Sequence, residues 1–158
     1  MSYAPVSAKI ATPIGMVEMV VENDLLVSVR IIPQTTTESV CEGNSTLDEA
    51  IIQMREYFAG QRRNFDLPLK PLTSMRGNAL RAGITSVGYG ETLSYGGLAH
   101  KVDSGPRAIG QACRRNPFPI IVPCHRITSA SGAAEHYSGG DGINTKAWLN
   151  AFERENRA

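Results

Sequence analysis

The segment that most restricts the fold is an apolar run, residues 116–126, that is interrupted by prolines and ends in a cysteine and a histidine. Pro117, Pro119 and Pro123 lie within it. Proline fixes φ and removes a backbone donor, so few conformations are open to this segment. The apolar residues 120–122 predict a short buried β-strand, because a strand buried on both faces needs no polar alternation.

Cys124 and His125 make the end of this run a candidate active site. The thiolate is the nucleophilic form of cysteine, and a neighbouring base makes it available near neutral pH. The alternative is that Cys124 only packs, because free cysteine is among the most buried residue types. Adjacent residues on a strand also point to opposite faces. From these two residues alone, both interpretations stay open.

The size of the chain and its cysteines limit the class of protein. Its 158 residues suffice for one domain or two small ones. No apolar run approaches the ~20 residues that span a bilayer, and we expect neither a secretory signal nor membrane association. Cys41, Cys113 and Cys124 match no zinc or disulfide framework. This spacing favours the reducing cytoplasm and predicts no metal site.

The two halves of the chain differ in charge. Residues 1–70 carry 6 Lys and Arg against 9 Asp and Glu, a net charge of −3, whereas residues 71–158 carry 10 against 6, a net charge of +4. The window 101–126 holds Asp103 and five basic residues, Lys101, Arg107, Arg114, Arg115 and Arg126. Clustered positive charge of this kind can bind a polyanion, although a modestly basic surface often does no more than contact solvent.

The first half has the pattern of strands followed by a helix. Residues 6–33 alternate in the manner of consecutive strands, with turn signals at 12–15 and 22–24. Ser45 with Asp48 resembles a capping box, and an apolar stripe at helical spacing then runs to Phe58, before Gly60. Residues 62–72 predict an extended connector, which places a domain boundary near residue 72.

The second half predicts a helix-turn-helix. Residues 73–87 are expected to be weakly helical at best, because Gly77 and Gly83 interrupt them. Ser94 caps a short helix to about residue 102, and Pro106 begins another that ends near Arg115. Two helices that pack only against each other would give the same pattern. A last helix is expected over 146–154.

Several separated motifs in this half resemble those of the O6-alkylguanine-DNA alkyltransferases. They are Arg107-Ala108-Ile109-Gly110, Asn116-Pro117, Pro123-Cys124-His125-Arg126 and Tyr137-Ser138-Gly139-Gly140. The resemblance implies an α/β protein in which a small ribonuclease-H-like α/β domain, residues 1–72, is a scaffold. It also implies a mostly α domain, residues 73–158, with a winged-helix-like helix-turn-helix that binds DNA.

The resemblance implies a chemistry for five residues. Glu153 orients His125, which takes the proton of Cys124 through a water, while Asn116 holds the turn that presents the thiol. Tyr95 protonates the guanine oxygen that leaves. The thioether product cannot be hydrolysed, so one chain repairs one base and needs neither metal nor organic cofactor. Without the resemblance, Glu153 is an exposed helix carboxylate and Tyr95 a core aromatic.

The resemblance also implies contacts with double-stranded DNA containing O6-alkylguanine, with O4-alkylthymine as a further candidate substrate, for a monomer in the cytoplasm. Arg107 would replace the flipped base in the stack, whereas without the resemblance it would more often be a phosphate contact or a solvated charge. The implied DNA-binding residues are Arg107, Ala108, Gly110, Ala112, Arg114 and Arg115. The implied pocket residues are Ile127, Tyr137 and Ser138. Two rival functions remain: a lesion sensor that flips the base without reacting, and a thiol hydrolase of a small substrate.

Overall fold

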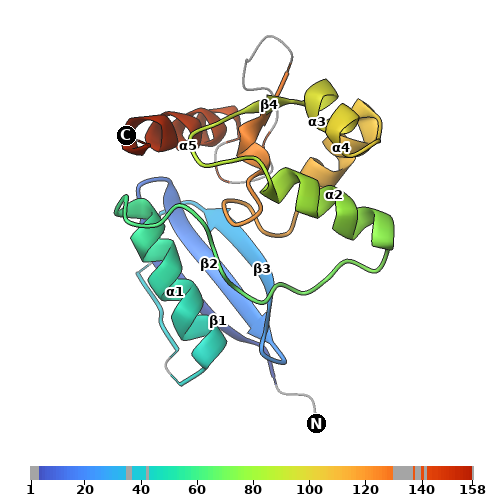
Figure 1. Ribbon diagram of the computed structural model, residues 1–158. Helices are drawn as coiled ribbons and strands as arrows, with labels where there is room; N and C mark the ends of the chain where they lie inside the picture. Colours follow the sequence, from blue (N-terminus) through green and yellow to red (C-terminus); the bar gives the residue numbers. More distant parts are fainter. Residues whose placement is uncertain are drawn as a thin grey trace. The chain divides into compact units, whose positions relative to one another are not determined.

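The structure is a computed structural model that describes residues 4–34, 37–41, 43–129, 137, 140 and 142–157. It consists of two compact units, Met1–Lys70 and Pro71–Ala158 (Figure 1). Each unit contains its own set of buried apolar side chains.

The first unit is built on an antiparallel meander. Strands β1 (Val6–Thr12), β2 (Gly15–Glu22) and β3 (Leu25–Ile32) lie in the order β1-β2-β3. Tight turns at residues 13–14 and 23–24 join the strands, and Val21 pairs with Leu26 after a register shift. The strands predicted from alternation are confirmed, because their inward residues are buried at period two.

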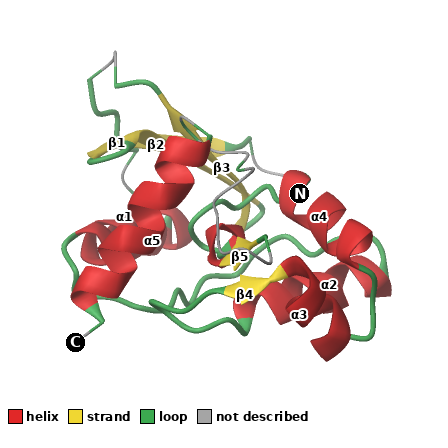
Figure 2. Ribbon diagram, turned by 90° about the horizontal axis from the view of Figure 1, so that it is seen from above, coloured by secondary structure: helices red, strands yellow, loops and turns green. Residues whose placement is uncertain are grey.

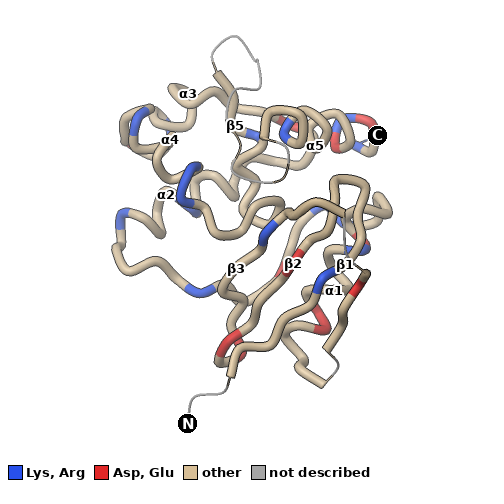
Figure 3. Tube along the Cα trace, turned by 180° about the vertical axis from the view of Figure 1, so that it is seen from behind, with Lys and Arg blue, Asp and Glu red and all other residues tan. Residues whose placement is uncertain are grey.

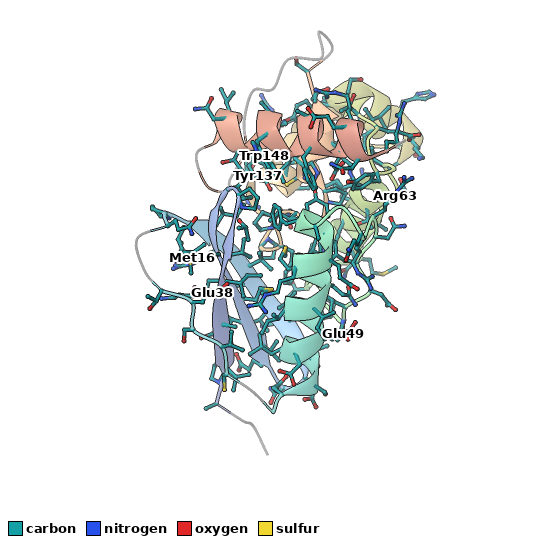
Figure 4. The ribbon with its side chains drawn as sticks, turned by 90° about the vertical axis from the view of Figure 1, so that its left-hand side faces the viewer. Met16, Glu38, Glu49, Arg63, Tyr137 and Trp148 are labelled. Atoms are coloured by element: carbon teal, nitrogen blue, oxygen red, sulfur yellow. The ribbon has the colours of Figure 1, made fainter. Side chains whose placement is uncertain are left out.

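Helix α1 (Ser45–Phe58) covers one face of this sheet (Figures 1 and 4). Leu47, Met54 and Tyr57 are fully buried between the helix and the strands. The predicted cap at Ser45 is wrong by one residue, because the Asn44 side chain accepts the Leu47 N–H at 2.9 Å. Asparagine and serine serve this position equally well, so the pattern does not distinguish them.

Among the residues described after position 70, the second unit contains four α-helices, one 3₁₀ turn and one short pair of strands. Figure 2 shows β4 and β5 side by side, with α2, α3 and α4 grouped beside them. In chain order the elements are α2 (Met75–Thr85), β4 (Leu93–Ser94), α3 (Tyr95–Lys101), α4 (Pro106–Arg114), the 3₁₀ turn η1 (Cys124–Arg126), β5 (Ile127–Thr128) and α5 (Ile143–Asn156).

Helix α2 is continuous, so the expectation of a weak helix over 73–87 is wrong. Ser74 caps it by accepting the Gly77 N–H at 2.9 Å. A Cβ on Gly83 would lie 2.5 Å from Cγ1 of Val102, the residue that follows α3. Glycine therefore permits close packing here, and this packing offsets its low helix propensity.

The predicted helix-turn-helix is confirmed. Ser94 caps α3 by accepting the Gly97 N–H at 2.9 Å, and Pro106 begins α4 at a position where no backbone donor is needed. Asp103 has φ of 55° in the connecting turn. Leu98 and Ile109 are fully buried, one from each helix. No helix within the described ranges is long and apolar enough to cross a membrane.

Candidate active site at Cys124

The segment before Cys124 is a compact turn, and the strand predicted over 120–122 is wrong. Val122 donates its N–H to Phe118 O at 2.9 Å, and Ile120 has φ of +77°. Residues 120–122 are nonetheless buried, as predicted. Apolar composition indicates burial but does not define backbone path, and Pro119 favours the turn. A β-branched residue in the left-handed region costs about 1–3 kcal/mol, so its surroundings must hold this turn in place.

Asn116 makes the hydrogen bonds that hold the turn. Its Oδ1 accepts the Phe118 N–H at 2.9 Å, and its Nδ2 donates to Val122 O at 3.0 Å. The same Nδ2 lies 3.1 Å from the sulfur of Cys124. The Asn116 amide therefore fixes both ends of the turn and also donates to the thiol.

Pro123 sets the direction in which Cys124 leaves the turn. Its φ of −81° and ψ of 61° are those of an inverse γ-turn, closed by a 2.8 Å hydrogen bond from Cys124 N to Val122 O. Arg126 N then donates to Pro123 O at 2.9 Å and begins the 3₁₀ turn that contains His125. Backbone hydrogen bonds thus fix Cys124 on both sides.

Cys124 is buried and acidic for a cysteine. Only 3% of the surface of this residue is exposed to solvent. A hydrogen bond from Cys113 lowers the pKa of Cys124 most, burial opposes this, and the Asn116 amide and the Lys146 charge lower the pKa further. The net direction is a lowered pKa, which favours the nucleophilic thiolate.

His125 and Glu153 form a hydrogen-bonded pair that is closed to solvent. His125 Nε2 and Glu153 Oε2 are 2.8 Å apart, and both residues are 0% exposed. Burial lowers the pKa of His125 despite the carboxylate, so the imidazole is neutral at pH 7. Although burial opposes it, hydrogen bonds and charges from His125 and Arg126 lower the pKa of Glu153 far below its ordinary value.

The ionised Glu153 determines the histidine tautomer. A carboxylate can only accept, so the proton of the neutral ring lies on Nε2. Nδ1 of His125 is then an unprotonated base, and it has no hydrogen-bond partner among the described residues. Glu153 therefore directs the basic nitrogen of His125 away from itself.

Arg126 belongs to this buried network, which sequence reasoning did not anticipate. It donates to Glu153 through Nε at 2.8 Å and Nη2 at 3.1 Å, and through Nη1 to Val87 O at 2.7 Å. The backbone N–H of Gly90 adds a donor to Glu153 at 3.2 Å. Arg126 is 4% exposed and so does not belong to the positive surface that its place in the basic window indicated.

Lys146 is a second buried cation that sequence reasoning did not assign. It is 0% exposed on α5, and its ammonium lies 5.6 Å from the centre of the Tyr95 ring. Its charge lowers the pKa of Cys124. A lysine on an amphipathic helix ordinarily faces solvent, so the pattern carried no signal for this position.

The three predicted pocket residues differ in what the structure shows of them. Ile127 is fully buried, and its backbone N–H donates to Cys124 O. Tyr137, labelled in Figure 4, meets His125 edge to face with ring centres 6.3 Å apart. Burial raises the pKa of Tyr137 well above its ordinary value, so its phenol stays protonated. Ser138 lies outside the described residues.

Helix α4 presents basic and small residues at its surface. Arg107 and Arg114 on the helix are exposed, as is Arg115 that caps it, and Figure 3 shows Lys and Arg positions on α2 and α4. A Cβ on Gly110 would meet nothing within 4 Å, and the other two small residues predicted at this surface, Ala108 and Ala112, are partly exposed. Packing within the protein therefore does not require a glycine at position 110.

The arrangement is suited to displacement by a thiolate. It combines a buried thiol with lowered pKa, hydrogen-bond donors to its sulfur, and a neutral histidine held by a carboxylate. Within the described ranges, no group of three or more His, Cys, Asp or Glu could hold a metal ion. All five residues predicted to be catalytic lie in the second unit.

Two family models match the chain. The model of the 6-O-methylguanine DNA methyltransferase ribonuclease-like domain matches residues 6–71. The model of the DNA binding domain of the same family matches residues 78–155.

Individual relatives agree with these matches. The methylated-DNA–protein-cysteine methyltransferase of Mycolicibacterium paratuberculosis is 34% identical over 148 residues, which cover 90% of this chain and 88% of the relative. A DNA base-flipping protein of Thermus thermophilus is 41% identical over 103 residues, which cover 63% of this chain and 68% of that relative. The crystal structure of Mycobacterium tuberculosis OGT in complex with DNA has a TM-score of 0.80 at 33% identity, covering 94% of this chain and 92% of that one.

Proposed function

The chain belongs to the 6-O-methylguanine DNA methyltransferase family, and we propose that Cys124 is the cysteine on which it accepts the alkyl group. Its activity is that of a methylated-DNA–protein-cysteine methyltransferase in DNA repair. The observation that carries the residue assignment is the 3.1 Å contact of Asn116 Nδ2 with the Cys124 sulfur, beside the buried His125–Glu153 pair.

The proton of Cys124 leaves through His125. Nδ1 of the neutral ring accepts it, relayed by a water molecule, and the imidazolium that forms is stabilised by Glu153 at 2.8 Å. Arg126 keeps Glu153 ionised throughout, because two of its nitrogens donate to the carboxylate. Glu153 is thus a positioning residue, and His125 is the base.

The thiolate then displaces guanine from the alkyl carbon. A carbon–sulfur bond forms as the bond from carbon to O6 breaks, and the electron pair goes to the purine. Tyr95 supplies the proton to the purine, and the Lys146 ammonium 5.6 Å from its ring lowers the cost of the transient phenolate. The thioether has no leaving group that water can displace, so the chain reacts once.

Helix α4 is the element that we assign to DNA. Exposed Arg107, Arg114 and Arg115 suit the phosphate backbone, and the open position at Gly110 lets the helix approach closely. A guanine O6 adduct lies inside the stacked duplex, so the base must be extruded to reach a buried thiol. Arg107 would fill the gap in the stack, and Ile127, Tyr137 and Ser138 would line the pocket.

Mass spectrometry of the protein after incubation with duplex DNA containing O6-methylguanine tests this assignment. We expect a gain equal to one CH₂ group, located on the peptide of Cys124, at no more than one per chain. Cys41→Ser should behave like the wild type, and Cys124→Ala should bind the duplex without gaining mass. We further propose that the active species is a monomer, which the same samples test by sedimentation.

Other outcomes would support the rival functions. Tight lesion binding with unmodified Cys124 would identify a sensor, in line with the similarity to a DNA base-flipping protein. Repair of many lesions per chain, or turnover of small thioesters without DNA, would identify a hydrolase. Either result would contradict the transfer of the alkyl group to Cys124.

A further inference from the structure

The backbone carbonyl of His125 is held by a side chain that the mechanism above does not use. Asn150 on α5 donates from Nδ2 to His125 O at 2.8 Å, and the contact is buried. Asn150 is 7% exposed and His125 is 0% exposed. A backbone carbonyl can only accept, so the amide nitrogen of Asn150, and not its oxygen, faces His125.

Asn150 belongs to a row of buried polar residues on α5. Lys146, Asn150 and Glu153 follow one another at spacings of four and three residues, so they lie on one face of the helix. All three are buried, and α5 packs against the 3₁₀ turn that contains His125. Asparagine is a poor helix former and is costly to bury without a partner. Its hydrogen bond to His125 offsets that cost and explains why a polar residue can occupy this position.

Two residues of α5 therefore hold His125 at two points. Glu153 Oε2 lies 2.8 Å from Nε2 of the ring, and Asn150 holds the backbone carbonyl of the same residue. A ring held at Nε2 alone can still pivot about that atom, and the pivot would move Nδ1. Because the second contact fixes the backbone, it restricts the pivot and keeps Nδ1 directed away from Glu153.

We propose that Asn150 is a positioning residue for alkyl transfer, which fixes the backbone of His125 so that Nδ1 stays aligned to take the proton of Cys124. The proposal rests on the proposed roles of His125 as base and of Cys124 as alkyl acceptor. The effect of Asn150 passes through His125, whose carbonyl its amide contacts.

Other charged or titratable groups face the imidazole of His125 and must stay unchanged in any test. Burial lowers the pKa of His125 most, the Glu153 carboxylate raises it, and the charges of Arg126 and Lys146 lower it further. The phenol ring of Tyr137 meets the imidazole edge to face. A substitution that removes only the contact with the carbonyl replaces none of these groups, so a change in the base would report the lost contact.

The pH dependence of methyl transfer tests the proposal. Asn150→Leu removes the donor and keeps a side chain of similar size. Asn156→Leu is the matched control, because Asn156 Nδ2 donates to the carbonyl of Phe152 at 2.8 Å on the same helix. With saturating O6-methylguanine duplex, transfer to Cys124 in a single turnover is followed by mass spectrometry from pH 6 to pH 10.

We expect Asn150→Leu to react roughly tenfold more slowly than the wild type at pH 7, with an unchanged Kd for the duplex. The two rates should converge at high pH, where the thiol of Cys124 ionises without help from the base. Asn156→Leu should follow the wild type at every pH.

The tautomer of His125 gives a second readout that needs no DNA. In protein with ¹⁵N-labelled histidine, the wild type should show separate NMR resonances for protonated Nε2 and unprotonated Nδ1. In Asn150→Leu a ring that pivots more freely should populate both tautomers, so the two resonances should move toward each other. The resonances of His100, which is exposed on α3, should not change and serve as the internal reference.

Failure of the proposal and failure of the function on which it rests give different results. Equal rates for Asn150→Leu and the wild type, a rate lowered by the same factor at every pH, or unchanged His125 resonances would each overturn the role of Asn150. No transfer in the wild type would instead contradict the role of Cys124. Thermal unfolding confirms that each variant is folded, and Asn150→Ala replaces Asn150→Leu if the latter is not.

Discussion

Glu153 accepts hydrogen bonds in the interior of the second unit from His125, from two nitrogens of Arg126 and from Gly90 N–H. An uncompensated buried charge is costly, so removal of one partner from such a group destabilises by about 3–5 kcal/mol. Glu153 consequently affects both the orientation of the His125 ring and the stability of the fold.

Glu153→Gln is expected to destabilise the protein most at neutral pH. The folded-state pKa of Glu153 lies below its ordinary value of 4.5, so its contribution is complete above that pH and is lost as the pH falls. The difference in unfolding free energy between wild type and variant, measured in urea, should therefore narrow from pH 7 to pH 3. Burial also lowers the pKa of His125 below 6.5, so the unfolded chain binds a proton at this residue more readily than the folded protein does. The free energy of unfolding of the wild type should therefore decrease as the pH falls below about that value.

Glu155→Gln is the matched control, because Glu155 is on the same helix and exposed. It should leave the unfolding free energy within about 0.5 kcal/mol of the wild-type value. A Glu153→Gln difference that stayed constant across this pH range would contradict the assignment of an ionised, buried Glu153.

At the scale of elements, helix α2 packs closely against the end of α3 because a glycine, Gly83, occurs where α3 approaches. Gly83 on α2 faces Val102 directly after α3, whereas Gly110 on α4 faces open space. Both residues are helical glycines, so they have the same backbone cost and differ only in their neighbours.

Gly83→Ala and Gly110→Ala are therefore expected to have opposite effects on stability. The first places Cβ 2.5 Å from Cγ1 of Val102 and should cost about 1–3 kcal/mol through overpacking. In Gly110→Ala the new Cβ contacts nothing, so the free energy of unfolding should rise by up to about 1 kcal/mol through helix propensity. Urea unfolding measures both. Adding Val102→Ala should recover much of the Gly83→Ala loss, and a purely additive double variant would contradict the contact.

The open position at Gly110 also permits a test of the α4 surface. Gly110→Leu should fold normally, yet its side chain would hold the helix away from the duplex and weaken binding roughly tenfold, about 1.4 kcal/mol. Fluorescence anisotropy with a labelled duplex gives the Kd. Ala147→Leu, at an exposed position of α5, is the control. Equal Kd values for the two variants would exclude Gly110 from the interface.

The sequence predicts regular elements here better than it predicts the turns and buried charges around Cys124. Alternation in β1 to β3, the cap Ser94 and the helix-starting Pro106 are local signals, and the structure confirms those elements. The turn at Ile120 depends on hydrogen bonds from Asn116, and the burial of Arg126 depends on a carboxylate 27 positions away. Such partners are set by tertiary packing, which local pattern does not encode.

At the scale of the whole molecule, reaction changes the protein permanently. The thiol of Cys124 is 3% exposed and accepts a hydrogen bond from Asn116. A methyl group on the sulfur removes the negative charge and adds volume to a packed interior. The methylated protein is thus a different molecule with its own stability.

We expect the methylated form to unfold at a lower temperature than the unmodified form, by an amount corresponding to about 1–3 kcal/mol. Differential scanning calorimetry of the two forms, purified away from DNA, measures the difference in Tm. Cys124→Ala taken through the same incubation should show no change. Equal Tm values for the two forms would contradict tight packing around the sulfur.

The parallel pairing of β4 with β5 has a consequence for how far a substrate must travel. Leu93 pairs with Ile127 and Ser94 with Thr128, so the residues that lead into α3 are bonded to those that directly follow Arg126. The start of α3 is therefore joined by backbone pairing to the segment that follows Cys124. In the proposed reaction, a base extruded toward Cys124 would meet a sulfur whose distance from the first turn of α3 is limited by this pairing.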